Sequence, residues 1–183
     1  MQEIIPSLEK YDVLCAEEPA GPNAIVVFGA SGDLTHRKLL VSLFELFSEG
    51  LLSERFYFLG CGRKEFSDAD FRNKAGQSIR ENSDSLSSET LNAFAGKLYY
   101  LPGDYDDADF YQRIKARSAQ LSQEHNVHES VVFYMAVPPT LYPAIVEHLS
   151  SAGLAHPSGP NGNQKVKLVV EKPFGRDLPS AVD

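Results

Sequence analysis

Cysteine is scarce in this sequence, tryptophan is missing, and long hydrophobic runs do not occur. The chain of 183 residues contains two cysteines, Cys15 and Cys61, too few for the disulfide framework of a small secreted domain. No apolar stretch approaches the ~20 residues that a membrane-spanning helix needs. The first ten residues include acids and Pro6, which is not typical of a signal peptide. We therefore expect a cytoplasmic protein without membrane contact.

Positive charge is also in deficit. The chain has 17 Lys and Arg against 25 Asp and Glu, which gives a formal net charge of −8. A surface of that sign does not suit general nucleic-acid binding, so a polyanionic ligand would need a local basic pocket. No metal is expected, because the histidines in the second half of the chain lack metal-ligand spacing. These are His125, His128, His148 and His156.

Short apolar runs alternate with helical patterns along most of the chain. Strands are expected at residues 24–28, 56–59, 98–101, 131–137 and 165–170. Helices are expected to begin near Asp33, Ser67, Asp106 or Asp107, and Thr140. This alternation favours an α/β fold with a doubly wound parallel sheet, a Rossmann-like dinucleotide-binding domain. We assign residues 1–22 to an N-terminal tail or arm and residues 23–183 to the domain.

Right-handed crossovers place the carboxyl ends of parallel strands along one edge of the sheet, where ligands bind. The first strand ends at Gly29, Gly32 follows, and a helix then begins. Glycines allow the backbone to approach a ligand closely, and the helix start carries a partial positive charge. The turn therefore predicts a phosphate or pyrophosphate site, although it lacks both the full G-x-G-x-x-G and the P-loop spacing.

The end of the second strand indicates which dinucleotide would bind. An NAD site usually has a carboxylate there for the ribose 2′-hydroxyl, whereas this chain has Arg63 and Lys64. A carboxylate would repel a 2′-phosphate, and the Arg63 guanidinium can form paired hydrogen bonds with it. A solvated surface pair is the alternative interpretation. The position after the second strand favours the phosphate and hence NADP.

Basic residues also follow the glycine turn, in the run Thr35-His36-Arg37-Lys38. Cations at a helix start are unfavourable against the dipole, and a bound anion would explain them. Lys38 is the strongest candidate, whereas His36 and Arg37 could equally point to water. Further along, Tyr111 and Lys115 have the spacing of the short-chain dehydrogenase pair, but a structural role on the helix surface is the better interpretation.

Three motifs together resemble glucose-6-phosphate dehydrogenases. They are Gly29-Ala-Ser-Gly-Asp-Leu34 with Lys38, Gly60-x-x-Arg63, and Glu171-Lys-Pro-Phe-Gly-Arg-Asp-Leu178. The similarity extends through Tyr105-Asp-Asp107 and residues 133–140, and covers nearly everything from residue 24 to 178. The resemblance implies the coenzyme domain of an enzyme that oxidises glucose 6-phosphate to 6-phosphogluconolactone with NADP, at the entry to the pentose phosphate pathway.

The resemblance also implies roles for individual residues. The pyrophosphate would lie on Gly29, Ala30, Ser31, Gly32, Asp33 and Leu34. Lys38 would contact the phosphates, and Arg63 would bind the 2′-phosphate. The coenzyme would be lined by Tyr105, Ala136, Val137 and Pro138. Lys172 would reach both glucose 6-phosphate and the coenzyme, with its backbone set by Pro173.

The family also has an Arg-Ile-Asp-His-Tyr-Leu-Gly-Lys segment and a later catalytic histidine with its aspartate partner, and neither occurs before Asp183. We therefore expect a domain that is incomplete at its C-terminal end and belongs to a longer, homo-oligomeric protein. Residues 1–183 alone should be inactive, because the catalytic base lies downstream. The alternative is a non-catalytic NADP-binding regulatory or interaction module, against which the presence of Lys172 argues.

Overall fold

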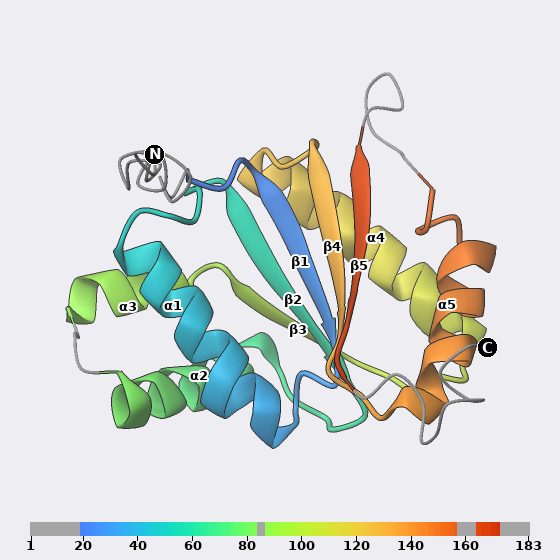
Figure 1. Ribbon diagram of the computed structural model, residues 1–183, viewed down its shortest axis with the longest axis horizontal. Coiled ribbons are helices and arrows are strands. Elements are labelled where there is room, and N and C mark those ends of the chain that lie inside the picture. Colours follow the sequence, from blue (N-terminus) through green and yellow to red (C-terminus); the bar gives the residue numbers. More distant parts are fainter. Residues whose placement is uncertain (1–18, 84–86, 157–163, 173–183) are drawn as a thin grey trace, which may run out of the picture.

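A five-stranded parallel sheet forms the centre of the protein, seen in a computed structural model that describes residues 19–83, 87–156 and 164–172 (Figure 1). The strand order is β3-β2-β1-β4-β5, and every neighbouring pair is parallel. Helices α1, α2 and α3 pack on one face, and α4 and α5 pack on the other. This arrangement confirms the predicted doubly wound, Rossmann-like α/β fold.

The strands and helices follow the predicted order. The strands are β1 (Asn23–Phe28), β2 (Phe56–Gly62), β3 (Leu98–Pro102), β4 (Ser130–Met135) and β5 (Lys165–Val170). The helices are α1 (Leu40–Ser48), α2 (Asp68–Asn82), α3 (Ser88–Ala95), α4 (Ala108–His125) and α5 (Tyr142–Ser151). A π-helical turn at Thr35–Leu39 precedes α1, and a 3₁₀ turn at Pro139–Leu141 precedes α5.

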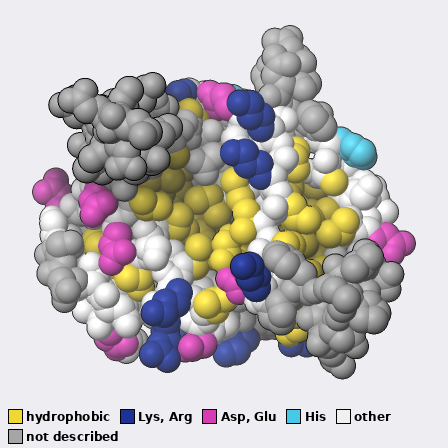
Figure 2. All heavy atoms as spheres, viewed as in Figure 1, with side chains coloured by type: hydrophobic (Ala, Val, Ile, Leu, Met, Phe, Trp, Pro, Cys, Tyr) yellow, Lys and Arg dark blue, Asp and Glu magenta, His cyan; other side chains and the backbone are white. Residues whose placement is uncertain are grey.

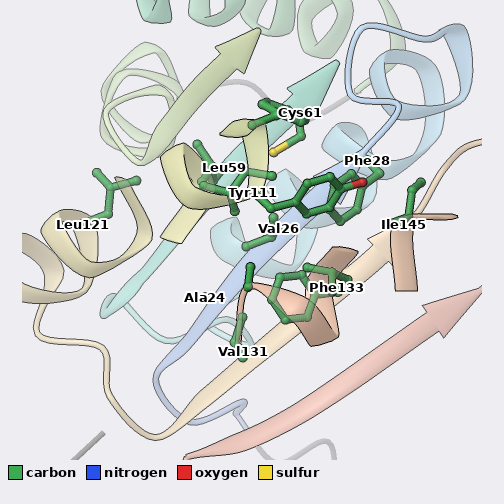
Figure 3. Close-up of a cluster of buried hydrophobic side chains, with 14 of the residues drawn as sticks. Ala24, Val26, Phe28, Leu59, Cys61, Tyr111, Leu121, Val131, Phe133 and Ile145 are labelled. Atoms are coloured by element: carbon green, nitrogen blue, oxygen red, sulfur yellow. The ribbon is translucent and has the colours of Figure 1, made fainter. Parts of the chain in front are cut away.

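The core lies on both faces of β1, which explains the absence of alternation in its sequence. Val26 and Phe28 face α4 and α5, and Figure 3 shows them beside Tyr111 and Ile145. Val27, between them, faces the layer of α1–α3. All five strand residues after Asn23 are buried as a result. The central strand therefore holds the two helical layers in one unit.

Two strands end two or more residues away from the predicted position. β2 continues through Gly62, three residues beyond the predicted end. Gly60 still pairs with β1 and β3, and Gly62 still pairs with β3. A Cβ on Gly60 would lie 2.7 Å from the Cβ of Ala30, so this glycine permits close packing rather than a turn. β4 instead ends at Met135, and the following residues cross the end of β1.

The predicted helix caps are present. The Ser67 hydroxyl accepts the Asp70 N–H, and the Ser67 backbone N–H donates to the Asp70 carboxylate, which makes a capping box at α2. Asp107, one of the two predicted residues, caps α4 by accepting the Asp109 N–H. These caps set where α2 and α4 begin after their strands.

The helical layers cover the sheet unevenly. Figure 1 shows α1–α3 beside β1, β2 and β3, while no described helix lies over the near face of β4 and β5. The space-filling view from the same side shows hydrophobic side chains gathered in the middle of this face (Figure 2). Among the residues that the structure describes, no helix is long and apolar enough to span a bilayer, and no group of three potential metal ligands occurs.

Candidate functional site

A cleft of about 350 Å³ opens at the carboxyl ends of β1, β2 and β4. The segments that follow these strands meet there, as the parallel topology requires. The cleft is lined by Gly29, Ser31, Gly32, Arg63, Lys64, Tyr105, Ala136, Val137, Pro138 and Leu141. Most of the residues predicted from the sequence for a dinucleotide site are therefore brought to one place.

Five predicted residues do not line this cleft. Ala30 is fully buried behind the turn, and Asp33, Leu34 and Lys38 are exposed outside the lining. Lys172 is exposed just after β5, and residues 173–183, including Pro173, lie outside the described residues. Next to it, Glu171 accepts a hydrogen bond from the Tyr134 hydroxyl. The proposed roles of these residues stay predictions.

Two lining residues were not among the predicted site residues. Lys64 follows Arg63 in the sequence but was not predicted to bind the coenzyme, although its position next to Arg63 could have indicated that it lines the cleft. Leu141 belongs to the 3₁₀ turn after Pro138. The sequence offers no signal for it, because its position depends on how that turn folds back over the strand end.

The glycine turn is held by bonds inside the protein. The Gly29 N–H donates to the Cys61 carbonyl and to the Tyr105 hydroxyl, both at 2.9 Å, and the Gly32 N–H donates to the Gly29 carbonyl at 2.9 Å. Gly29 has φ +86°, and a Cβ there would lie 2.0 Å from the Ala136 carbonyl oxygen. The amides of Gly29 and Gly32 are therefore engaged within the protein.

Tyr105 supports this turn from behind. Its hydroxyl accepts the Gly29 N–H and lies 3.3 Å from the Cys61 carbonyl, to which it donates. Burial raises the pKa of Tyr105 to about 12, so the phenol keeps its proton under ordinary conditions. The Tyr111 hydroxyl in turn donates to the Tyr105 carbonyl at 2.8 Å. Tyr105 thus lines the cleft while its hydroxyl orients the backbone.

The positive charge in the cleft has no acidic partner among the described residues. Arg63 and Lys64 are exposed, and neither forms an ion pair with another residue in the described part of the chain. Arg37, by contrast, lies 3.5 Å from the Asp33 carboxylate outside the cleft, and both side chains are largely exposed. Arg37 therefore points to solvent, which was one of the two interpretations of this residue. The cations available to an anion in the cleft come from the end of β2.

His36 follows neither predicted alternative. It is 4% exposed, and its ring packs 5.5 Å from that of Phe71 on α2. Burial, together with Lys74 and Lys64, lowers the pKa of His36 to about 4, so the ring is neutral and cannot balance an anion. The prediction was wrong because the turn is π-helical, which changes the direction of its side chains relative to a regular helix.

Tyr111 and Lys115 have the structural role that the sequence analysis favoured. The Tyr111 hydroxyl is engaged with the Tyr105 carbonyl, and the Lys115 ammonium donates to the Ala152 carbonyl at 2.9 Å. Tyr111 is fully buried within the core beneath α4. Neither residue is among those that line the cleft.

Comparison with known proteins gives one consistent result. The family described as "Glucose-6-phosphate dehydrogenase, NAD binding domain" matches residues 26–183. The chain is 36% identical to glucose-6-phosphate 1-dehydrogenase of Aggregatibacter actinomycetemcomitans over 157 residues, and 34% identical to that of Bacillus subtilis over 157 residues. These alignments cover 86% of this chain but 31% and 30% of the two relatives, so the chain spans about a third of their length.

Solved structures show the same similarity. A glucose-6-phosphate dehydrogenase in complex with its substrate glucose-6-phosphate superposes with a TM-score of 0.77 at 29% identity, covering 90% of this chain and 33% of that one. Glucose-6-phosphate 1-dehydrogenase from Mycobacterium avium gives a TM-score of 0.71 at 25% identity, covering 88% of this chain and 32% of that one.

Gly29→Ala should destabilise the fold more than Gly50→Ala. Both glycines have positive φ, so alanine at either position costs about 1–2 kcal/mol in backbone strain. A Cβ meets nothing within 4 Å at Gly50 but overlaps the Ala136 carbonyl at Gly29. We expect a further loss of about 1–3 kcal/mol for Gly29→Ala, measured by denaturant unfolding. Equal losses in the two variants would show that the contact with Ala136 is easily relieved.

His36→Phe should flatten the dependence of stability on pH. Because the folded-state pKa of about 4 lies below the ordinary 6.5, the unfolded chain binds more protons between these values. The stabilisation is therefore complete above pH 6.5 and is lost as the pH falls toward 4. One such group contributes a slope of up to about 1.4 kcal/mol per pH unit, which the variant should lack in unfolding experiments across this window. An unchanged slope would contradict the buried, neutral histidine.

Proposed function

This chain belongs to the glucose-6-phosphate dehydrogenase family, and on that premise we propose that it binds NADP for the oxidation of glucose 6-phosphate to 6-phosphogluconolactone. This reaction would serve the entry step of the pentose phosphate pathway. The observation that carries the choice of NADP is the pair of uncompensated cations, Arg63 and Lys64, at the end of β2 in the cleft. The activity itself is proposed for the longer protein, since the relatives are about three times the length of this chain.

The residues of the cleft fit this coenzyme chemically. The turn from Gly29 to Leu34 would hold the pyrophosphate, with its amides after Gly32 toward the ligand. Arg63 and Lys64 would hold the 2′-phosphate by charge-assisted hydrogen bonds. No Asp or Glu is among the described residues that line the cleft, so no carboxylate there opposes an anionic ligand. A weakly polar wall of Tyr105 and residues 136–138 would accompany the rest of the coenzyme.

NADP, when bound, supplies the acceptor for the hydride that leaves the sugar. The chain's own part would be to bind and orient. Lys172 would attract the phosphorylated sugar and the coenzyme from the end of β5, where its side chain is exposed. Support for this substrate comes from the similar structure that was solved with glucose-6-phosphate. No histidine or carboxylate is among the described residues lining the cleft, so we place the general base outside them.

A non-catalytic NADP-binding module is the second candidate. The same lack of a base among the described cleft residues favours it for this stretch of chain. Lys172 argues against it, because a coenzyme sensor does not need a cation at the sugar side. The two candidates agree on the coenzyme and differ on whether glucose 6-phosphate is bound and oxidised.

Arg63→Ala should weaken NADP binding and leave NAD binding nearly unchanged. The loss of a charged hydrogen-bond pair costs roughly 1.5–3 kcal/mol, or about ten- to a hundredfold in the dissociation constant. Titration calorimetry with both coenzymes measures this difference. Arg37→Ala is the matched control, because that arginine pairs with Asp33 outside the cleft. Equal weakening of both coenzymes by Arg63→Ala would exclude recognition of the 2′-phosphate.

Residues 1–183 alone should bind NADP without oxidising glucose 6-phosphate above background. No oxidation is expected because we place the general base that the reaction needs outside the described residues of the cleft. Coenzyme binding by calorimetry and NADPH formation by absorbance test the two halves of the statement separately. Robust turnover would show that the base has been misplaced, whereas failure to bind NADP would refute both candidate functions.

A further inference from the structure

Tyr100 lies beside the part of the cleft that would hold the coenzyme's 2′-phosphate, although it is not among the lining residues. We propose that Tyr100 is a positioning residue for coenzyme selection, which holds the segment carrying Arg63 at a set distance from the glycine turn. The inference rests on the proposed function, because it assumes that Arg63 binds the 2′-phosphate. It adds a residue that acts through Arg63 without touching the ligand.

The hydroxyl of Tyr100 lies between two walls of the cleft. It donates to the Lys64 carbonyl at 2.9 Å, one residue beyond Arg63. The Ser31 side chain of the glycine turn lies on its other side, because a Cβ on Gly62 would meet both the Tyr100 hydroxyl oxygen and the Ser31 Oγ. Tyr100 thus bonds the segment after β2 and lies against the turn at the end of β1.

Gly62 leaves the space that this arrangement needs. A Cβ on Gly62 would lie 2.7 Å from the Tyr100 hydroxyl oxygen and 3.1 Å from the Ser31 Oγ. Any side chain larger than hydrogen would therefore displace the phenol or the serine. Gly62 lies immediately before Arg63, so the close approach occurs where the chain leaves β2. This explains a glycine at a strand position whose φ does not require one.

Tyr100 itself is held firmly. Its backbone N–H donates to the Asp68 carboxylate at 2.7 Å, and Arg117 bonds the other oxygen of that carboxylate at 2.8 Å. Its ring lies 5.1 Å from that of Phe71 and 5.4 Å from that of Phe66. The residue is 4% exposed, and burial raises the pKa of its phenol. The backbone of Tyr100 is therefore held by Asp68 of α2, its ring is packed in place, and its hydroxyl keeps the proton that it donates.

The fixed donor restricts the backbone from which Arg63 extends. The Arg63 side chain is exposed and has no ion pair among the described residues, so no salt bridge there orients it. Without the bond to the Lys64 carbonyl, the segment would sample more conformations, and ordering it would then oppose binding. That cost applies to a ligand bound through Arg63 and not to one that lacks the 2′-phosphate.

The test is Tyr100→Phe, with NADP and NAD affinities measured by titration calorimetry. We expect NADP to weaken about three- to tenfold, the range for one neutral hydrogen bond, and NAD to change less than about twofold. Tyr99→Phe is the matched control. The Tyr99 hydroxyl contacts Glu124 and His125, and its side chain belongs to the cluster on the other face of the sheet. This control should leave both affinities unchanged.

Combining Tyr100→Phe with Arg63→Ala separates the two proposals. If Tyr100 acts through Arg63, its substitution has no further effect on NADP once Arg63 is alanine. If Arg63→Ala fails to discriminate between the coenzymes, the proposed function is wrong. If Arg63→Ala does discriminate, three results would show that the positioning role is wrong. Tyr100→Phe could leave the NADP affinity unchanged, it could weaken NAD binding as much as NADP binding, or it could weaken NADP binding further in the Arg63→Ala background. Should Tyr100→Phe not fold, Gly62→Ala replaces it, because its methyl displaces the same phenol.

Discussion

The close approach of Gly29 to its neighbours is the constraint on which the cleft depends. Its amide bonds the Cys61 carbonyl and the Tyr105 hydroxyl, while its Cα faces the Ala136 carbonyl so closely that no Cβ fits. One residue thereby joins the ends of β1, β2 and β4 to the loop before α4. Gly29 makes these contacts with its own backbone atoms, whereas Tyr105 contributes its side-chain hydroxyl.

The electrostatics of the cleft are local rather than global. The chain is acidic overall, with a net charge of −8, yet the end of β2 presents two cations without an acidic partner in the described residues. Two other basic residues nearby do not add positive charge to the cleft, because Arg37 is paired with Asp33 and His36 is neutral. Selection between phosphorylated and unphosphorylated ribose would therefore depend on Arg63, Lys64 and the residues that hold them.

Local patterns were sufficient to predict most elements of the fold. Apolar runs without alternation marked strands buried on both faces, and Ser67 and Asp107 marked helix starts through their capping side chains. The predicted second strand ended at Leu59, before Gly60 and Gly62, because a glycine that permits close packing looks the same in sequence as one that permits positive φ. The difference lies in what faces them, Ala30 and Tyr100 in this fold.

The sequence by itself determined the class of fold, which segments follow the carboxyl ends of the strands, and the residue types in those segments. Parallel topology makes these consequences of local pattern, because successive strands must end at the same edge. Only the tertiary structure decided which side chains enter the cleft. His36 turned into the core on a π-helical turn, Leu141 came to line the cleft, and the Tyr100 hydroxyl bonded the Lys64 carbonyl beside Ser31. Such contacts join residues far apart in the chain, and packing against several elements sets them.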